Sequence, residues 1–123
     1  MKAAIIVLAD PAGGEDAVGR VFNALASAND FHLRGQEAIV LFQGAGTRWP
    51  ETIGDPEHPV HGLFEQTRPL VRGASGACST VFGARAGVEK AGVAFVGGNS
   101  IEGVGELPSL AGLVADGYTV LTF

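Results

Sequence analysis

A continuous apolar run near the amino terminus, Ala3 to Ala9 (AAIIVLA), constrains the fold more than any other stretch of the chain. A half-exposed strand alternates apolar and polar residues, whereas a parallel strand that is covered on both faces is apolar throughout and rich in branched side chains. The run therefore predicts a buried parallel strand. The residues from Asp10 to Gly14 have the composition of the turn that follows it.

Strand and helix signals alternate along the rest of the chain. Further strands are predicted at Ala38–Phe42, Gly73–Ala77, Val93–Val96 and Tyr118–Phe123. Because parallel strands are joined by right-handed crossovers, this alternation predicts an α/β fold. The expected architecture is a three-layer α/β/α sandwich with a five-stranded parallel sheet, flavodoxin-like in appearance, in a single domain that spans residues 1–123.

Apolar residues at helical spacing predict the helices between these strands. The first helix has one apolar stripe, formed by Val18, Val21, Phe22 and Leu25. A second helix is predicted from Val60 to about Gln66, because Pro69 interrupts the pattern beyond it. A third is predicted from Cys78 to Gly92, and a last short helix between Pro108 and Gly117.

Two segments are interpreted as loops. Gln43 to His58 contains several glycines and prolines and no apolar period, so it is expected to be a long loop that is more mobile than the sheet. Its Trp49 is favoured as a packing residue or a subunit contact over a ligand-stacking residue. Gly97 to Glu106 is a second, glycine-rich loop. Both loops should meet Cys78 in one crevice at the carboxyl edge of the sheet.

Composition excludes several classes of protein. The eight Lys and Arg residues are scattered and the net charge is -5, so no basic stripe is available for nucleic acid. No apolar run is long enough to span a membrane, and the apolar run that stops at Asp10 is too short for a signal peptide. With a single cysteine and no intramolecular disulfide, the chain is expected to be a soluble, cytoplasmic protein.

Common cofactor and metal motifs are also missing. Neither a G-x-G-x-x-G turn nor a Walker lysine follows the first strand, and Asp10 and Glu15 would repel a pyrophosphate, so nucleotide binding is not expected. His58 and His61 could lie close together, but no third ligand is near them in sequence, so they are interpreted as surface histidines rather than a metal site. A Cys-His hydrolytic pair stays open, without an elbow motif to support it.

Cys78 is the candidate catalytic residue. Gly73 and Gly76 precede it and Ser79-Thr80 follow it, which places the thiol at a predicted helix N-terminus. Backbone N–H groups and the helix dipole favour a thiolate there. If instead Val81 and Phe82, which the helix is expected to bury, seal the site, Cys78 is a small buried hydrophobic residue without chemistry.

Three stretches give the chain a resemblance to a known family. They are KAAIIVLAD at the amino terminus, LFEQTRPLVRGASGACSTVFGA around the cysteine and LAGLVADGYTVLTF at the end of the sequence. Together they resemble the DsrE/DsrF-like (TusD-like) sulfur-relay family over nearly the whole chain. The resemblance implies a five-stranded parallel sheet of order 4-3-2-1-5 and assembly into homotrimers or homohexamers.

The resemblance also implies a function. Cys78 matches the family's sulfur-carrying position, so the chain is expected to be a sulfur carrier or sulfurtransferase that accepts sulfane sulfur as a persulfide from a donor protein or a small sulfur compound and hands it to an acceptor protein. No cofactor is needed for this exchange. The loop from Gly97 to Glu106 has no His, unlike some relatives, and no second cysteine is present. The alternative is a non-enzymatic oligomeric binding or scaffold subunit in which Cys78 is structural.

Overall fold

In the computed structural model, which describes residues 1–123, five parallel strands form one sheet in the order β4-β3-β2-β1-β7. The strands are β1 (Lys2–Val7), β2 (Glu37–Phe42), β3 (Val71–Ser75), β4 (Phe95–Val96) and β7 (Tyr118–Thr122). The predicted fold class, a three-layer α/β/α sandwich, is confirmed. The strand order is also the one that the resemblance implied.

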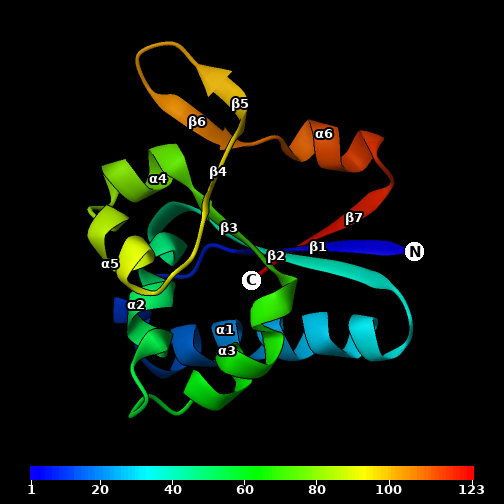
Figure 1. Cartoon of the computed structure of the whole chain (residues 1–123), viewed down its shortest axis with the longest axis vertical. Helices are drawn as coiled ribbons and strands as arrows, with labels where there is room; N and C mark the ends of the chain where they lie inside the picture. The colour runs from blue at the N-terminus through cyan, green and yellow to red at the C-terminus, as the bar shows by residue number, and fades with distance from the viewer.

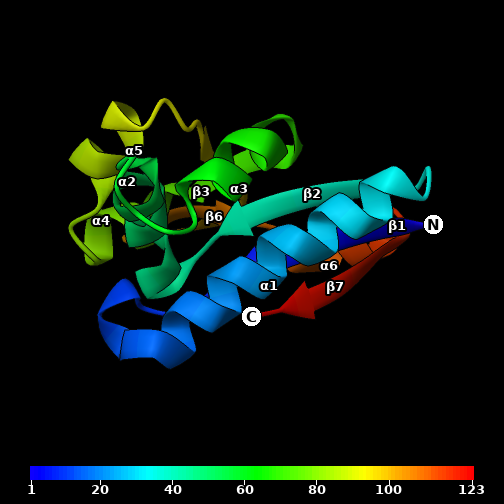
Figure 2. The ribbon, with the colours of Figure 1, turned by 90° about the horizontal axis from the view of Figure 1, so that it is seen from below.

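Helices cover the two faces of the sheet unequally (Figure 1). The long helix α1 (Gly14–Leu33) and the short helix α3 (His61–Thr67) lie on one face, where α1 runs alongside β1 and β2 (Figure 2). The other face carries α6 (Leu110–Ala115) and a hairpin of β5 (Gly98–Ile101) and β6 (Gly105–Pro108). The helices α2 (Trp49–Gly54), α4 (Gly76–Val81) and α5 (Arg85–Lys90) gather at the carboxyl end of the strands.

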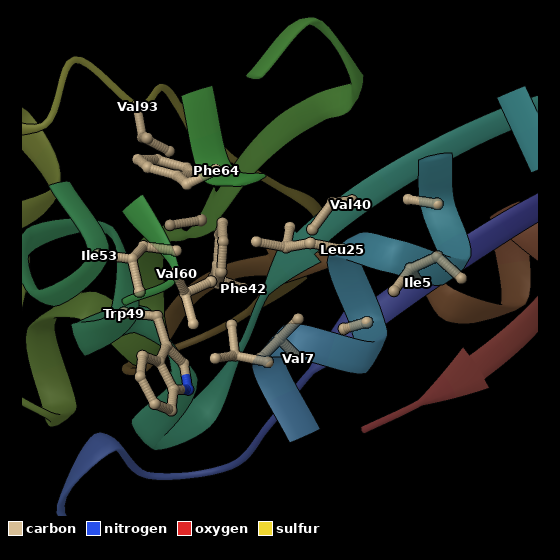
Figure 3. Close-up of a cluster of buried hydrophobic side chains, with 14 of the residues drawn as sticks. Ile5, Val7, Leu25, Val40, Phe42, Trp49, Ile53, Val60, Phe64 and Val93 are labelled. Atoms are coloured by element: carbon tan, nitrogen blue, oxygen red, sulfur yellow. The ribbon is translucent and has the colours of Figure 1, made fainter. Parts of the chain in front are cut away.

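The main hydrophobic core lies between the sheet and the α1 side (Figure 3). It contains 19 buried residues, against six in the cluster on the α6 side, so most apolar burial is on the α1 side. Successive side chains of β2 alternate between the two faces of the sheet. Val40 and Phe42 point into the main core, and Ile39 and Leu41 point toward α6. The apolar runs of the central strands are thus explained by burial on both faces.

The inner face of α1 differs from the predicted stripe at one residue. Val21 and Leu25 are fully buried and Val18 is half-buried, but Phe22 is 49% exposed, so its assignment to the core was wrong. Small residues complete the buried face instead: Ala17, Ala24 and Ala28. The buried residues recur every three or four positions, so they share one face of α1, and Phe22 lies beside that face.

The segment from Gln43 to His58 is not a long loop, and that prediction was wrong. It forms the 3-10 helix η2 (Gly44–Arg48) followed directly by α2. Pro50, which was interpreted as a loop residue, lies in the first turn of α2, where a proline does not disrupt the helix. Because these helical turns supply backbone hydrogen bonds, the ground for expecting a mobile segment is removed.

Trp49 is a packing residue, as favoured from the sequence, and not a subunit contact. Its side chain is fully buried in the main core (Figure 3). Its Nε1 donates a hydrogen bond of 2.7 Å to the carbonyl oxygen of Ala9. The indole therefore connects α2 to the chain that follows β1. The expectation that the segment of Trp49 shares a crevice with Cys78 was wrong.

The third strand and the helix after it were each misplaced. β3 spans Val71–Ser75, two residues earlier than predicted, and Gly73 within it is required by a close approach, since a Cβ there would lie 2.5 Å from the Ala94 carbonyl oxygen. The helix predicted from Cys78 to Gly92 is two short helices, α4 and α5, that are separated at Gly83, whose φ is +64°.

The side chains that this helix was expected to bury differ in their exposure. Val88 on α5 is fully buried, Phe82 is half-buried, and Val81 is 69% exposed, so the prediction that Val81 packs in the core was wrong. Val81 therefore does not seal the surroundings of Cys78.

The residues from Gly97 to Glu106 were expected to form a loose loop, and most of them form the β5–β6 hairpin instead. Asn99 pairs with Leu107, Ser100 with Glu106 and Ile101 with Gly105 in antiparallel register. Both strands are largely exposed, so no alternation of apolar residues marks them in the sequence. The turn between the strands contains Gly103, which has a positive φ. The sequence lacks a usual hairpin-turn pair such as Asn-Gly there, so its glycines were interpreted as a loop.

Candidate functional site

Cys78 lies in the first turn of α4, directly after the carboxyl end of β3. Its predicted position near a helix N-terminus is confirmed. The residue is half-buried, while its neighbours Ala77 and Ser79 are buried. The residue thus belongs neither to the core nor to the fully exposed surface.

Two buried serines fix the turn that carries Cys78. Ser75 is the N-cap of α4, and its Oγ accepts a hydrogen bond of 3.2 Å from the backbone N–H of Cys78. The hydroxyl of Ser79 donates to the carbonyl oxygen of Ser75 at 2.7 Å. The cap is Ser75, three residues before the thiol, and not one of the hydroxyls of Ser79 and Thr80 that follow Cys78 and were expected to cap the helix.

Two arginines contact the backbone of α4, and the local sequence did not identify either of them as a neighbour. Arg85 Nη1 donates to the carbonyl oxygen of Gly76 at 3.2 Å and to Thr80 Oγ1 at 3.3 Å. Its guanidinium also lies 4.1 Å from the centre of the Phe95 ring. The positive charge of Arg85 is therefore held along the helix that carries the thiol.

Arg48 reaches the other end of α4 from η2. Its Nε donates to the carbonyl oxygen of Phe82 at 3.1 Å, and its Nη1 pairs with Asp10 Oδ2 at 3.2 Å. Asp10 Oδ1 in turn accepts from the N–H of Ala12. These contacts connect the segments that follow three neighbouring strands. Because Arg48 lies 34 residues from Phe82 in the sequence, only the fold brings the two together.

A cavity of about 300 Å³ lies beside α4. Gly76, Thr80 and Arg85 form one wall, and Gly105 and Glu106 of the hairpin form the opposite one. Neither Cys78 nor Trp49 lines it, so the predicted crevice exists between α4 and the hairpin only. The thiol is on the adjacent part of the helix surface.

The two histidines considered as metal ligands serve local structure. His58 Nδ1 accepts a hydrogen bond of 3.1 Å from the N–H of Val60, and His61 Nδ1 lies 2.9 Å from the carbonyl oxygen of Ile53. No group of three His, Cys, Asp or Glu side chains gathers in a way that could hold a metal ion. Both rings therefore stabilise the connection between α2 and α3.

Two pairs on exposed helix surfaces displace a pKa value. A hydrogen bond to Asp16 on α1 raises the pKa of Arg20, and a hydrogen bond from Arg68 lowers the pKa of Glu65 on α3. Both are pairs one turn apart on a helix, and such pairs contribute little to stability. They do not take part in the site around Cys78.

The chain matches no protein-family model, no curated protein and no solved structure. None of its helices combines the length and the apolar composition that a membrane crossing requires. What the fold and the site define is a parallel α/β domain with one half-buried cysteine on a capped helical turn, in a helix whose two ends each accept a hydrogen bond from an arginine. Chemically, such a thiol can act as a nucleophile or be oxidised.

Proposed function

We propose that the chain is a sulfur carrier in which Cys78 accepts sulfane sulfur as a persulfide and passes it on. The observation that carries the proposal is the half-buried position of Cys78 on the first turn of α4, with its backbone fixed by Ser75. The resemblance of the sequence around Cys78 to the DsrE/DsrF-like family supports the same function. The donor and the acceptor are proteins or small sulfur compounds that present a thiol.

The transfer consists of two exchanges that balance without an oxidant or a cofactor. The Cys78 thiolate attacks the outer sulfur of a donor persulfide, R–S–SH. A new S–S bond forms at Cys78, the donor S–S bond breaks, and the donor leaves as a thiolate. An acceptor thiolate then attacks the outer sulfur on Cys78, and the Cys78 thiolate leaves. The outer sulfur moves as a sulfane sulfur throughout.

The charges around α4 suit this chemistry. Two exchanges between thiolates bring negative charge to the helix surface, and Arg85 and Arg48 hold positive charge at either end of α4. Arg85 contacts the face of α4 that Gly76 and Thr80 share, about half a turn from Cys78, and Arg48 is partly neutralised by Asp10. The two arginines therefore add positive charge to the surface around the site, and neither is assigned a direct contact with the thiol.

The alternative is a non-enzymatic oligomeric binding or scaffold subunit in which Cys78 only packs. It requires a thiol that is closed to reagents in the folded state. The half-buried position of Cys78 and the exposure of Val81 favour the carrier over this alternative. The carrier hypothesis predicts that iodoacetamide labels Cys78 in the folded protein, and the scaffold hypothesis predicts that it does not.

The test is intact mass spectrometry after incubation with glutathione persulfide. We expect wild-type protein to gain one sulfur atom, and Cys78→Ser to gain none. Addition of a thiol acceptor such as dithiothreitol should remove the added sulfur. Thr80→Ala, which alters the neighbouring exposed hydroxyl but leaves the thiol, is the matched control and should load like wild type.

Two outcomes would end the carrier hypothesis. One is a wild-type protein that gains no sulfur under conditions in which a small thiol does. The other is a Cys78 that iodoacetamide labels only after unfolding, because a thiol closed to a small alkylating reagent is also closed to a persulfide. The second result would favour the structural cysteine.

We also propose a homo-oligomer, a homotrimer or a homohexamer, located in the cytoplasm, where lone thiols stay reduced. Support comes from large apolar side chains that are exposed on α6 and on the hairpin: Ile101, Val104, Leu110 and Val114. Exposed apolar patches frequently mark contacts between proteins.

Sedimentation equilibrium at micromolar concentration should therefore show three or six copies. Val114→Glu, which changes a side chain that is 62% exposed on α6, should shift the protein toward the monomer without loss of folding. A monomer for wild type at these concentrations would disprove the proposed assembly and leave the sulfur-loading test unaffected.

A further inference from the structure

Arg85 holds a guanidinium group in a fixed place and leaves part of its hydrogen-bonding capacity unused. Its Nη1 donates to the carbonyl oxygen of Gly76 and to Thr80 Oγ1, and its guanidinium carbon lies 4.1 Å from the centre of the Phe95 ring. Its Nε and Nη2 donate to no other group of the protein, and none of the five ion pairs includes Arg85. The free edge of such a guanidinium can bind a carboxylate through two parallel hydrogen bonds.

Glu106 lies on the opposite wall of the cavity beside α4 and also has no charged partner. Its Oε1 accepts a hydrogen bond of 3.1 Å from Ser100 Oγ, and its Oε2 accepts none from the protein. The side chain packs against Gly97, where a Cβ would lie 2.5 Å from Oε2, so the glycine makes room for the carboxylate. Arg85 and Glu106 thus line one cavity from opposite sides without forming an ion pair.

The cavity lies at the carboxyl end of β3 and β4, where β6 packs beside α4 (Figure 1). Open α/β sheets bind their ligands at this edge. Its volume of about 300 Å³ is at the lower end of the range for small-molecule sites. Three of its lining residues are large and apolar: Phe95, Val96 and Val104. A ligand of this cavity is therefore small and can bury a short apolar portion.

The two unpaired charges select the ligand. An anion would be attracted by Arg85 and repelled by Glu106, and a cation would meet the reverse. A zwitterion can place its carboxylate at the guanidinium and its ammonium group at the carboxylate, so that each charge has a partner. An α-amino acid carries both groups on one carbon, and an apolar side chain on that carbon suits the apolar part of the walls.

We propose that this cavity binds an α-amino acid with an apolar side chain, whose carboxylate pairs with Arg85 and whose ammonium group pairs with Glu106. The site does not use the sulfur chemistry, because Cys78 lies about half a turn around α4 from Gly76 and Thr80, which line the cavity. Cys78→Ser protein should bind the amino acid like wild type, so this proposal and the sulfur-carrier proposal fail separately.

The test is an NMR titration of ¹⁵N-labelled protein with L-valine and with two analogues that each lack one charge. Isovalerate lacks the ammonium group, and isobutylamine lacks the carboxylate. We expect valine to shift the backbone signals of Thr80, Phe95 and Gly105 saturably, with a Kd of about 1–10 mM, as fits a ligand of so few atoms. Each analogue should bind about tenfold more weakly, because it loses one charged hydrogen bond and meets a like charge. This comparison needs no variant.

Glu106→Gln keeps the size of the side chain and the acceptor for Ser100, and removes the charge. It should weaken valine binding by about tenfold and strengthen isovalerate binding, so that the preference for the zwitterion is lost. Glu102→Gln makes the same change of charge at the exposed turn of the hairpin, outside the cavity. It is the matched control and should leave both affinities unchanged.

Three results would overturn the proposal. The first is a failure of the wild-type signals to saturate with valine by about 100 mM, far above the expected Kd. The second is an analogue that binds as tightly as valine, which would indicate a site for a single charge. The third is an unchanged valine Kd in Glu106→Gln.

Discussion

Trp49→Ala is expected to lower the free energy of unfolding by about 3–5 kcal/mol. The indole is fully buried in the main core, and its removal leaves a large void between α2 and the end of β1 (Figure 3). The carbonyl oxygen of Ala9 also loses the donor that lies 2.7 Å away. The void and the lost hydrogen bond both lower the free energy of unfolding.

Urea unfolding followed by far-ultraviolet circular dichroism measures this change, because Trp49 is the only tryptophan and its fluorescence is lost with it. Trp49→Phe retains most of the apolar volume and should lose roughly half as much or less. The control is Phe22→Ala, whose side chain is 49% exposed and should cost about 1 kcal/mol or less. Equal losses for Trp49→Ala and Phe22→Ala would contradict the buried position of the indole.

Gly46→Ala is expected to destabilise the protein by about 3 kcal/mol, the upper end of typical overpacking losses. A Cβ on Gly46 would overlap the carbonyl group of Val7 and approach the Cα of Leu8 to 3.3 Å. These obstacles are backbone atoms of β1 and the residue after it, so no side chain can move aside. η2 would have to shift from the sheet and take Arg48 with it.

Substitution of a second glycine should change the stability in the opposite direction and serves as the control. Gly19 lies within α1, and a Cβ there would meet nothing within 4 Å. Gly19→Ala should therefore stabilise the protein by about 0.5–1 kcal/mol, because alanine is the better helix former. The urea midpoints of the two variants should lie on either side of wild type. A Gly46→Ala midpoint at or above that of wild type would show that η2 does not pack against β1 as described.

The sheet could be predicted from the sequence because its signals are local. The run from Ala3 to Ala9 and the pairs of branched residues in β2 are apolar on both faces, and only a covered parallel strand accounts for this. The end of α3 at Pro69 followed from the geometry of proline in the same way. The elements that were missed have ambiguous signals. Pro50 starts a helix as readily as it ends one, and the β5–β6 hairpin has no buried face.

The candidate site could be predicted only in part. Cys78 was found because the residues that place it in the first turn of a helix are its own neighbours. Arg48 and the buried, unpaired side-chain oxygen of Gln43 were not found, because their surroundings are made by segments far away in the sequence. Whether a buried polar side chain has a hydrogen-bond partner depends on tertiary contacts, and it cannot be predicted from residue type and spacing.

The unequal cover of the two sheet faces has a consequence for how the molecule opens. On one side α1 spans 20 residues over the main core, whereas on the other α6 has six residues and a smaller buried cluster. Local openings follow the least buried apolar area, so α6 and the hairpin can detach while the α1 side stays closed. Amide protons of Leu113 would then exchange through this small opening and those of Leu25 only through global unfolding. The protein therefore has one layer that opens locally and one that opens only when the whole molecule unfolds.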